Sequence, residues 1–367
     1  MKKATNYSLL VYALFLVCIY LIGSFVLSKG AGAIGGNAFV FYLIAIIIGF
    51  IITVIFMELG HIVGAKIGGY RIISVSFLWL TFVRQNKKWK ITTTTFDGFT
   101  GETKVAPKKE NANPMPMFWF GTMFLLILML LGIYLPSIIS TKDSLKTHFV
   151  YGGYIISTIA GLMVFYNILP LRLDTKNDAI MMRFVRKERI QKYNDICRIQ
   201  GELYDGEGLE ELEDLPENDY LLAHWNYYAY LEKVYNGEYQ KAEEILDRMI
   251  QDSEKLPDAI YDELLAAKLV LLLLTKSKEE AQEYFLSVSP QVRKTINLCS
   301  TVEGSRNYFF ISAIMNDNFE EAKSAYKKYL TKEKQNLEVG RNFDEDSMMA
   351  MMMNQIHEIH PEWNFKK

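Results

Sequence analysis

Four long apolar stretches constrain the fold of this chain more than any other feature. They cover residues 9–27, 38–57, 117–135 and 149–171, and none of the four contains a charged residue. About 20 residues of helix are needed to cross a bilayer. The sequence therefore predicts a polytopic, mainly α-helical membrane protein with four spans. A first domain would cover residues 1–190, and no apolar run of comparable length follows it.

The first stretch could instead be a cleaved signal peptide, because Ala31-Gly32-Ala33 resembles a cleavage site. The apolar core of a signal peptide usually has about 7 to 15 residues, which is shorter than the stretch from 9 to 27. We therefore favour a membrane anchor. The three cysteines lie far apart in the sequence and indicate no disulfide framework.

Charge divides the chain at the same place as hydropathy. Residues 1–190 contain 20 basic and 8 acidic side chains, whereas the remainder contains 20 basic and 34 acidic ones. The segment 58–116 between the second and third spans is rich in lysine and arginine. Because such loops stay in the cytosol, we expect a multi-pass protein of the cell membrane with both termini cytosolic. The basic half would contact the lipid bilayer, and we expect no nucleic-acid partner.

A β-hairpin is expected between the second and third spans. Residues 70–83 and 88–95 are rich in β-branched and aromatic side chains, and Gln85-Asn86-Lys87 is a plausible turn between them. The residues from Phe96 to Gly101 are expected to form a loop. The segment is either an ordinary juxtamembrane loop or a strand edge that an extended peptide can join.

The second apolar stretch ends in Met57-Glu58-Leu59-Gly60-His61. This run matches the zinc motif H-E-x-x-H except that methionine replaces the first histidine. In that motif the two histidines lie one above the other on a helix face, and the glutamate between them activates a zinc-bound water. The thioether of Met57 is a poor zinc ligand. The motif is therefore one ligand short.

The fourth stretch ends in a second motif, in which Asn167 precedes Pro170 by three residues and two carboxylates, Asp174 and Asp178, follow. A polar side chain and a helix-breaking proline are costly in lipid and usually line a cavity inside a protein. The two motifs, with the expected hairpin between them, resemble the site-2 protease group of intramembrane metallopeptidases, family M50. The resemblance covers about residues 38–182.

The resemblance implies roles for particular residues. In that family two histidines and an aspartate hold zinc, so it implies that Glu58 is the base, that His61 is a metal ligand, and that Asp178, or alternatively Asp174, is the carboxylate ligand. Asp178 is followed by Ala179 where the family has glycine, and its distance from Pro170 is longer than usual. The expected cofactor is zinc, bound weakly or not at all.

The same resemblance implies that Asn167 and Pro170 contact the extended backbone of a substrate. We expect a degenerate homologue that binds a membrane-spanning peptide or partner protein without efficient cleavage, because Met57 disrupts the metal site. The alternative is an active intramembrane protease with an altered set of zinc ligands.

The second half, residues 200–367, is predicted to be a cytosolic helical domain. Three segments share a helix, a short polar turn and a following alanine, namely Ala242, Ala281 and Ala322. This resembles a loose tetratricopeptide pattern, in which small alanines let paired helices approach; the alternative is an unspecific helical bundle. Such a domain would bind a cytosolic protein partner.

Overall fold

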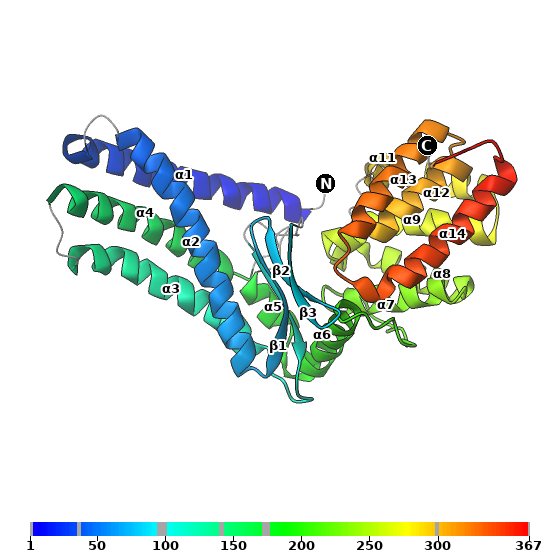
Figure 1. Cartoon of the computed structure of the whole chain (residues 1–367), viewed down its shortest axis with the longest axis horizontal. Coiled ribbons are helices and arrows are strands. Elements are labelled where there is room, and N and C mark those ends of the chain that lie inside the picture. Colours follow the sequence, from blue (N-terminus) through cyan, green and yellow to red (C-terminus); the bar gives the residue numbers. More distant parts are fainter. Residues whose placement is uncertain are drawn as a thin grey trace. The chain divides into compact units, whose positions relative to one another are not determined.

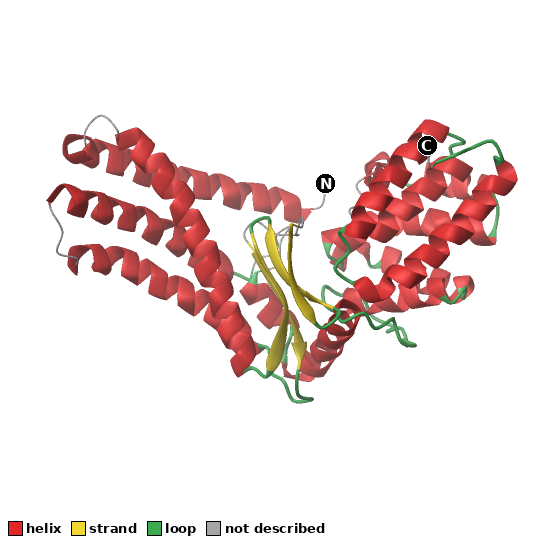
Figure 2. Ribbon diagram, in the orientation of Figure 1, coloured by secondary structure: helices red, strands yellow, loops and turns green. Residues whose placement is uncertain are grey.

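A computed structural model describes residues 3–34, 38–93, 101–138, 143–170, 177–297 and 301–365. Within these ranges the chain is mainly helical, with one small antiparallel sheet (Figure 2). Its internal contacts divide it into two compact units. Unit 1 comprises residues 1–83 and 90–197, and unit 2 comprises residues 84–89 and 198–367.

Unit 1 is built around four long helices: α1 (Lys3–Ile34), α2 (Ala38–Ile67), α3 (Met115–Ile138) and α4 (Asp143–Ile168). Three segments, Ala38–Ile67, Met115–Pro136 and Lys146–Ile168, are long and apolar enough to cross a membrane. The corresponding apolar part of α1, Leu9–Phe25, is shorter. These helices leave many large apolar side chains exposed, as is expected of surfaces that face lipid.

Glycines bring α2 and α3 into close contact (Figure 1). A Cβ atom on Gly60 would lie 2.4 Å from the carbonyl oxygen of Phe120, and one on Gly64 would lie 2.3 Å from that of Pro116. Small residues spaced four apart let two membrane helices approach until their backbones touch. The helix that carries Glu58 and His61 is therefore fixed against α3.

The sheet contains β1 (Tyr70–Phe77), β2 (Leu80–Gln85), β3 (Lys88–Thr93) and β4 (Gly101–Pro107), in the order β3-β2-β1-β4. The single long strand predicted over residues 70–83 is wrong, because the chain reverses at Leu78 and Phe77 pairs with Leu80. Leu78 has a φ of 55°, a conformation that turns usually assign to glycine or asparagine. The turn therefore carries no sequence signal.

β4 is the second departure from the expected hairpin. The loop expected up to Gly101 is followed at once by this strand, which pairs with β1 from Tyr70↔Pro107 to Phe77↔Gly101. β1 and β4 both contact α2. Beyond α3 and α4, unit 1 continues with α5 (Asp178–Phe184) and with most of α6 (Ile190–Tyr204).

Unit 2 is an array of helix pairs: α7 (Leu222–Tyr235) with α8 (Tyr239–Gln251), α9 (Asp258–Thr275) with α10 (Lys278–Ser287), and α12 (Val302–Ile314) with α13 (Phe319–Lys334). Each turn between partners is short, and Ala242, Ala281 and Ala322 are fully buried behind these turns. The short α11 (Pro290–Arg293) precedes α12. A single 3-10 turn (Val339–Arg341) leads into the last helix, α14 (Asn342–Ile359).

Candidate functional site

The imidazole of His61 lies between two carboxylates in unit 1. Its Nε2 is 3.2 Å from both carboxylate oxygens of Asp178, and its Nδ1 is 3.3 Å from Oε2 of Glu58. His61 and Glu58 are one helical turn apart on α2, whereas Asp178 begins α5. The two motifs singled out in the sequence, 117 residues apart along the chain, therefore meet at one side chain.

Glu58 is fully buried, and its position is fixed by β4. The hydroxyl of Thr103 donates a hydrogen bond of 2.5 Å to Glu58 Oε2. Gly101, on the same strand, leaves room for the carboxylate, since a Cβ atom there would lie 2.9 Å from Glu58 Oε1. The strand that the sequence did not predict thus supplies the main partner of the expected catalytic base.

Asp178 is placed by its neighbour Asn177, a residue that the sequence did not single out. The side-chain oxygen of Asn177 accepts the Ile180 N–H at 2.8 Å and so caps α5. Its amide nitrogen donates to the carbonyl oxygens of Tyr166 and Leu169 at the end of α4. One buried amide therefore joins the end of α4 to the start of α5 and sets the position of Asp178.

Met57 is buried among apolar side chains. It is 5% exposed and packs in a buried cluster with Leu125, Met163 and Val164. Its sulfur accepts a hydrogen bond of 3.4 Å from the side-chain amide of buried Asn167. The position that holds a histidine in the zinc motif is therefore part of the packed interior of unit 1, and Asn167 is engaged there as well.

The described side chains that converge here are too few to hold a zinc ion. Zinc sites in proteins use three or four nitrogen, sulfur or carboxylate ligands around the metal, whereas His61 Nε2 and Asp178 are the two donors that meet on one side of the ring among the described residues. Glu58 faces the opposite ring nitrogen. The two ring nitrogens of His61 therefore face carboxylates on opposite sides. Among the described residues no group of three or more His, Cys, Asp or Glu side chains is arranged to hold a metal ion.

Asp174, the alternative carboxylate ligand, lies outside the described residues. Pro170 is exposed just beyond the end of α4 and takes no part in the contacts around His61. Gly121 is a further residue that the sequence did not reveal. A Cβ atom there would lie 2.2 Å from His61 Nε2 and 3.0 Å from Asp178 Oδ2, so α3 passes directly over the pair because it has no side chain at this point.

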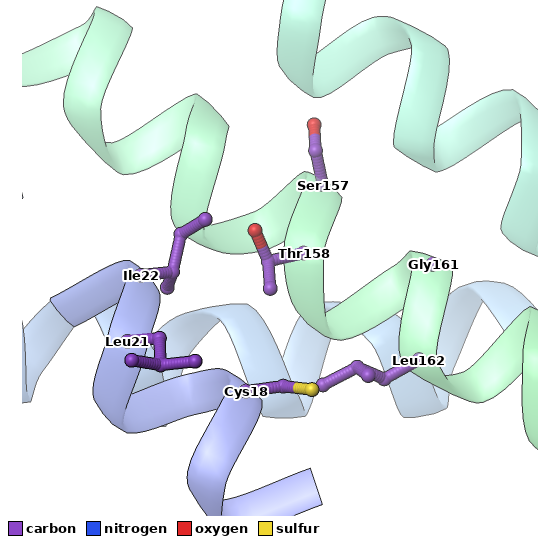
Figure 3. A pocket seen from close by; sticks show the side chains of 7 residues that line it. All are labelled: Cys18, Leu21, Ile22, Ser157, Thr158, Gly161 and Leu162. Carbon is purple, nitrogen blue, oxygen red and sulfur yellow. The ribbon is translucent and has the colours of Figure 1, made fainter. Parts of the chain in front are cut away.

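A hollow of about 470 Å³ opens between α1 and α4 in the same unit (Figure 3). It is lined by Cys18, Leu21, Ile22, Ser157, Thr158, Gly161 and Leu162. The hydroxyls of Ser157 and Thr158 already donate to the carbonyl oxygens of Met129 and Tyr154. The hollow therefore presents mainly apolar surface.

Comparison of the chain with protein-family models, with curated proteins and with solved structures found no match.

Proposed function

We propose that this protein is a degenerate relative of the site-2 protease group, which binds a membrane-spanning peptide or partner protein without cleaving it efficiently. One observation carries the proposal. The ring of His61 has a carboxylate at each nitrogen, while Met57 is buried in an apolar cluster with Leu125, Met163 and Val164. The motif residues then act as a structural tie between α2, α5 and β4, and among the described residues no set of three ligands would hold a metal on which Glu58 could activate water.

The sheet supports a role in binding an extended peptide. β4 pairs with β1 on one side, and in the described part of the chain no strand pairs with its other side. An added strand would lie about 4.8 Å from β4, and Thr103 on β4 contacts Glu58. A peptide joined to this edge by main-chain hydrogen bonds would therefore be held beside the Glu58–His61 pair.

The binding role can be tested with a photo-crosslinking residue at Glu102, which lies next to Thr103 and has a 42% exposed side chain. We expect adducts with an intact membrane protein that are absent when the crosslinker replaces Ile44, an exposed residue of α2. A shortened adduct that disappears in Glu58→Gln would instead favour the active protease. If Glu102 gives no more adduct than Ile44, the binding role is wrong.

The membrane arrangement is part of the same proposal. We infer four spans, with α1 as the first, both termini in the cytosol and unit 2 as a cytosolic, tetratricopeptide-like domain that binds a protein partner. The basic segment after α2 supports this orientation. Cysteines introduced at Lys88 and Lys255 should be labelled only after cells are opened, and one at Lys142 in intact cells. Labelling of position 255 from outside would refute this orientation.

A further inference from the structure

Helix α14 in unit 2 packs on the first helices of two different pairs, α7 and α12 (Figure 1). In arrays of helix pairs, equivalent helices line up on one face, and that face commonly binds peptides. The segment from Glu338 to Glu345 lies against this face. A part of the chain itself therefore covers the surface that such an array offers to a partner.

Charged pairs hold this segment in place. Arg306 of α12 and Glu345 of α14 are 1% and 0% exposed, and their Nη1 and Oε2 atoms are 2.8 Å apart. The guanidinium of Arg341 donates to both carboxylate oxygens of Glu303 on α12, at 3.1 and 3.4 Å. Helix α12 thus supplies one buried arginine and one buried glutamate, and the segment from Glu338 to Glu345 supplies the same pair.

Tyrosines of α7 complete the contact. Tyr235 donates to the Glu345 carboxylate, Tyr228 donates to Glu338 at 2.9 Å, and Tyr227 donates to Glu303 at 3.0 Å. Arginine and tyrosine are enriched where proteins recognise one another. Buried ion pairs, in contrast, often stabilise a fold no better than apolar packing of the same volume. The composition here is that of a recognition surface.

The apolar contacts of α14 follow the pattern of a helix bound in a groove. Met348, Met349, Met352 and Ile356 are buried on one side of the helix, in line with Glu345. An amphipathic helix that enters a groove presents anchors at this spacing. Methionine side chains adapt to different neighbours, so they suit a contact that can dissociate and form again.

We propose that the face formed by α7 and α12 is a helix-binding groove, and that residues 336–365 are its exchangeable intramolecular occupant. When this segment leaves, the groove would accept a partner helix. Such a helix would carry an arginine and a glutamate four residues apart, followed by an apolar stripe. The inference rests on the proposed role of unit 2 in binding a partner. It is independent of the metal-site argument.

The test uses the full chain in detergent with a protease recognition sequence inserted after Gln335, which is exposed at the end of α13. After cleavage, a fluorescent peptide of residues 336–365 is added and its anisotropy is followed. We expect the labelled peptide to replace the nicked segment, and the uncut chain to bind at least about tenfold less of it, because its own segment fills the groove.

Two peptide variants show whether the charged pairs carry recognition. Glu345→Arg should weaken binding by about tenfold or more, since it places an arginine against buried Arg306. Glu358→Arg changes an exposed position of α14 and should bind as the unmodified peptide does. The proposal is overturned if the nicked chain unfolds or aggregates, if it does not exchange the peptide, or if Glu345→Arg binds normally. None of these outcomes depends on whether unit 1 binds a membrane peptide.

Discussion

The side-chain amide of Asn167 lies 3.4 Å from the sulfur of Met57 and donates a hydrogen bond to it. Each of these residues belongs to one of the two motifs, on α2 and on α4. The methionine is therefore not merely a missing ligand, because its sulfur accepts a hydrogen bond from a buried polar side chain. The contact couples the changed motif position to the residue implied to hold a substrate.

Metal content tests the loss of the site directly. The purified protein should hold well under one zinc per chain, because the described donors on one side of His61 are two rather than three. Met57→His should raise the zinc content several-fold, since it restores the histidine pair on α2. Met57→Leu is the control, because it keeps an apolar side chain of similar size and should bind no additional metal. Stoichiometric zinc in the unmodified protein, lost on Asp178→Ala, would contradict this prediction.

The hydroxyl of Thr103 should contribute to stability through Glu58. Thr103→Val removes the donor at 2.5 Å from a fully buried carboxylate and should lower the free energy of unfolding by about 1–3 kcal/mol. Thr103→Ser keeps the hydroxyl and should cost less. Thermal unfolding of both variants in the same detergent measures the difference. Equal melting temperatures would mean that Glu58 does not depend on this bond.

Much of unit 1 could be predicted, because long apolar runs have few alternatives in a membrane protein. The long apolar helices α2, α3 and α4 and strand structure after α2 follow from hydropathy and residue type alone. The meeting of His61 with Asp178 followed only from the family resemblance, since no local pattern brings residues 117 positions apart together. The alanines of unit 2 marked the turns between paired helices, and all three are fully buried there.

The residues that surround Glu58, His61 and Asp178 could not be predicted from the sequence, for physical reasons. Thr103 lies on a strand whose residues carry no strong alternation, and the turn at Leu78 lacks glycine, asparagine and proline. Gly121 has no side chain to suggest a role in the site. Its role is to let α3 pass over His61, where a side chain would clash with the imidazole. Asn177 acts as a helix cap seven residues after a proline. In this segment the sequence pattern indicates the two carboxylates as site residues and does not indicate the asparagine.

Stability of unit 2 should depend on pH through Glu333 on α13. Burial, together with the neighbouring carboxylate of Asp346, raises the pKa of Glu333 above its usual 4.5, and Lys334 opposes this only in part. An acid with a raised folded-state pKa binds its proton more tightly when folded, so the free energy of unfolding falls as pH rises from 4.5 through the folded pKa. Asp346→Asn should therefore raise the melting temperature at pH 7 more than at pH 4.

Glu320→Gln is the matched control, because it removes an exposed carboxylate from the same helix, α13. Its effect on the melting temperature should be small and should not follow the same trend with pH. A stabilisation by Asp346→Asn that is the same at both pH values would show that Glu333 does not titrate differently in the folded state.

Substitution of Gly121 tests whether the close approach of α3 sets the geometry around His61. In Gly121→Ala the added methyl group would overlap the imidazole, so His61 or α3 must move, at a cost of about 1–3 kcal/mol. Gly152→Ala on α4 is the control, because its methyl group would meet only Phe41 at 3.7 Å, an ordinary contact. We expect a lower melting temperature for the first variant and little change for the second. Equal behaviour of the two would mean that α3 does not confine the His61–Asp178 pair.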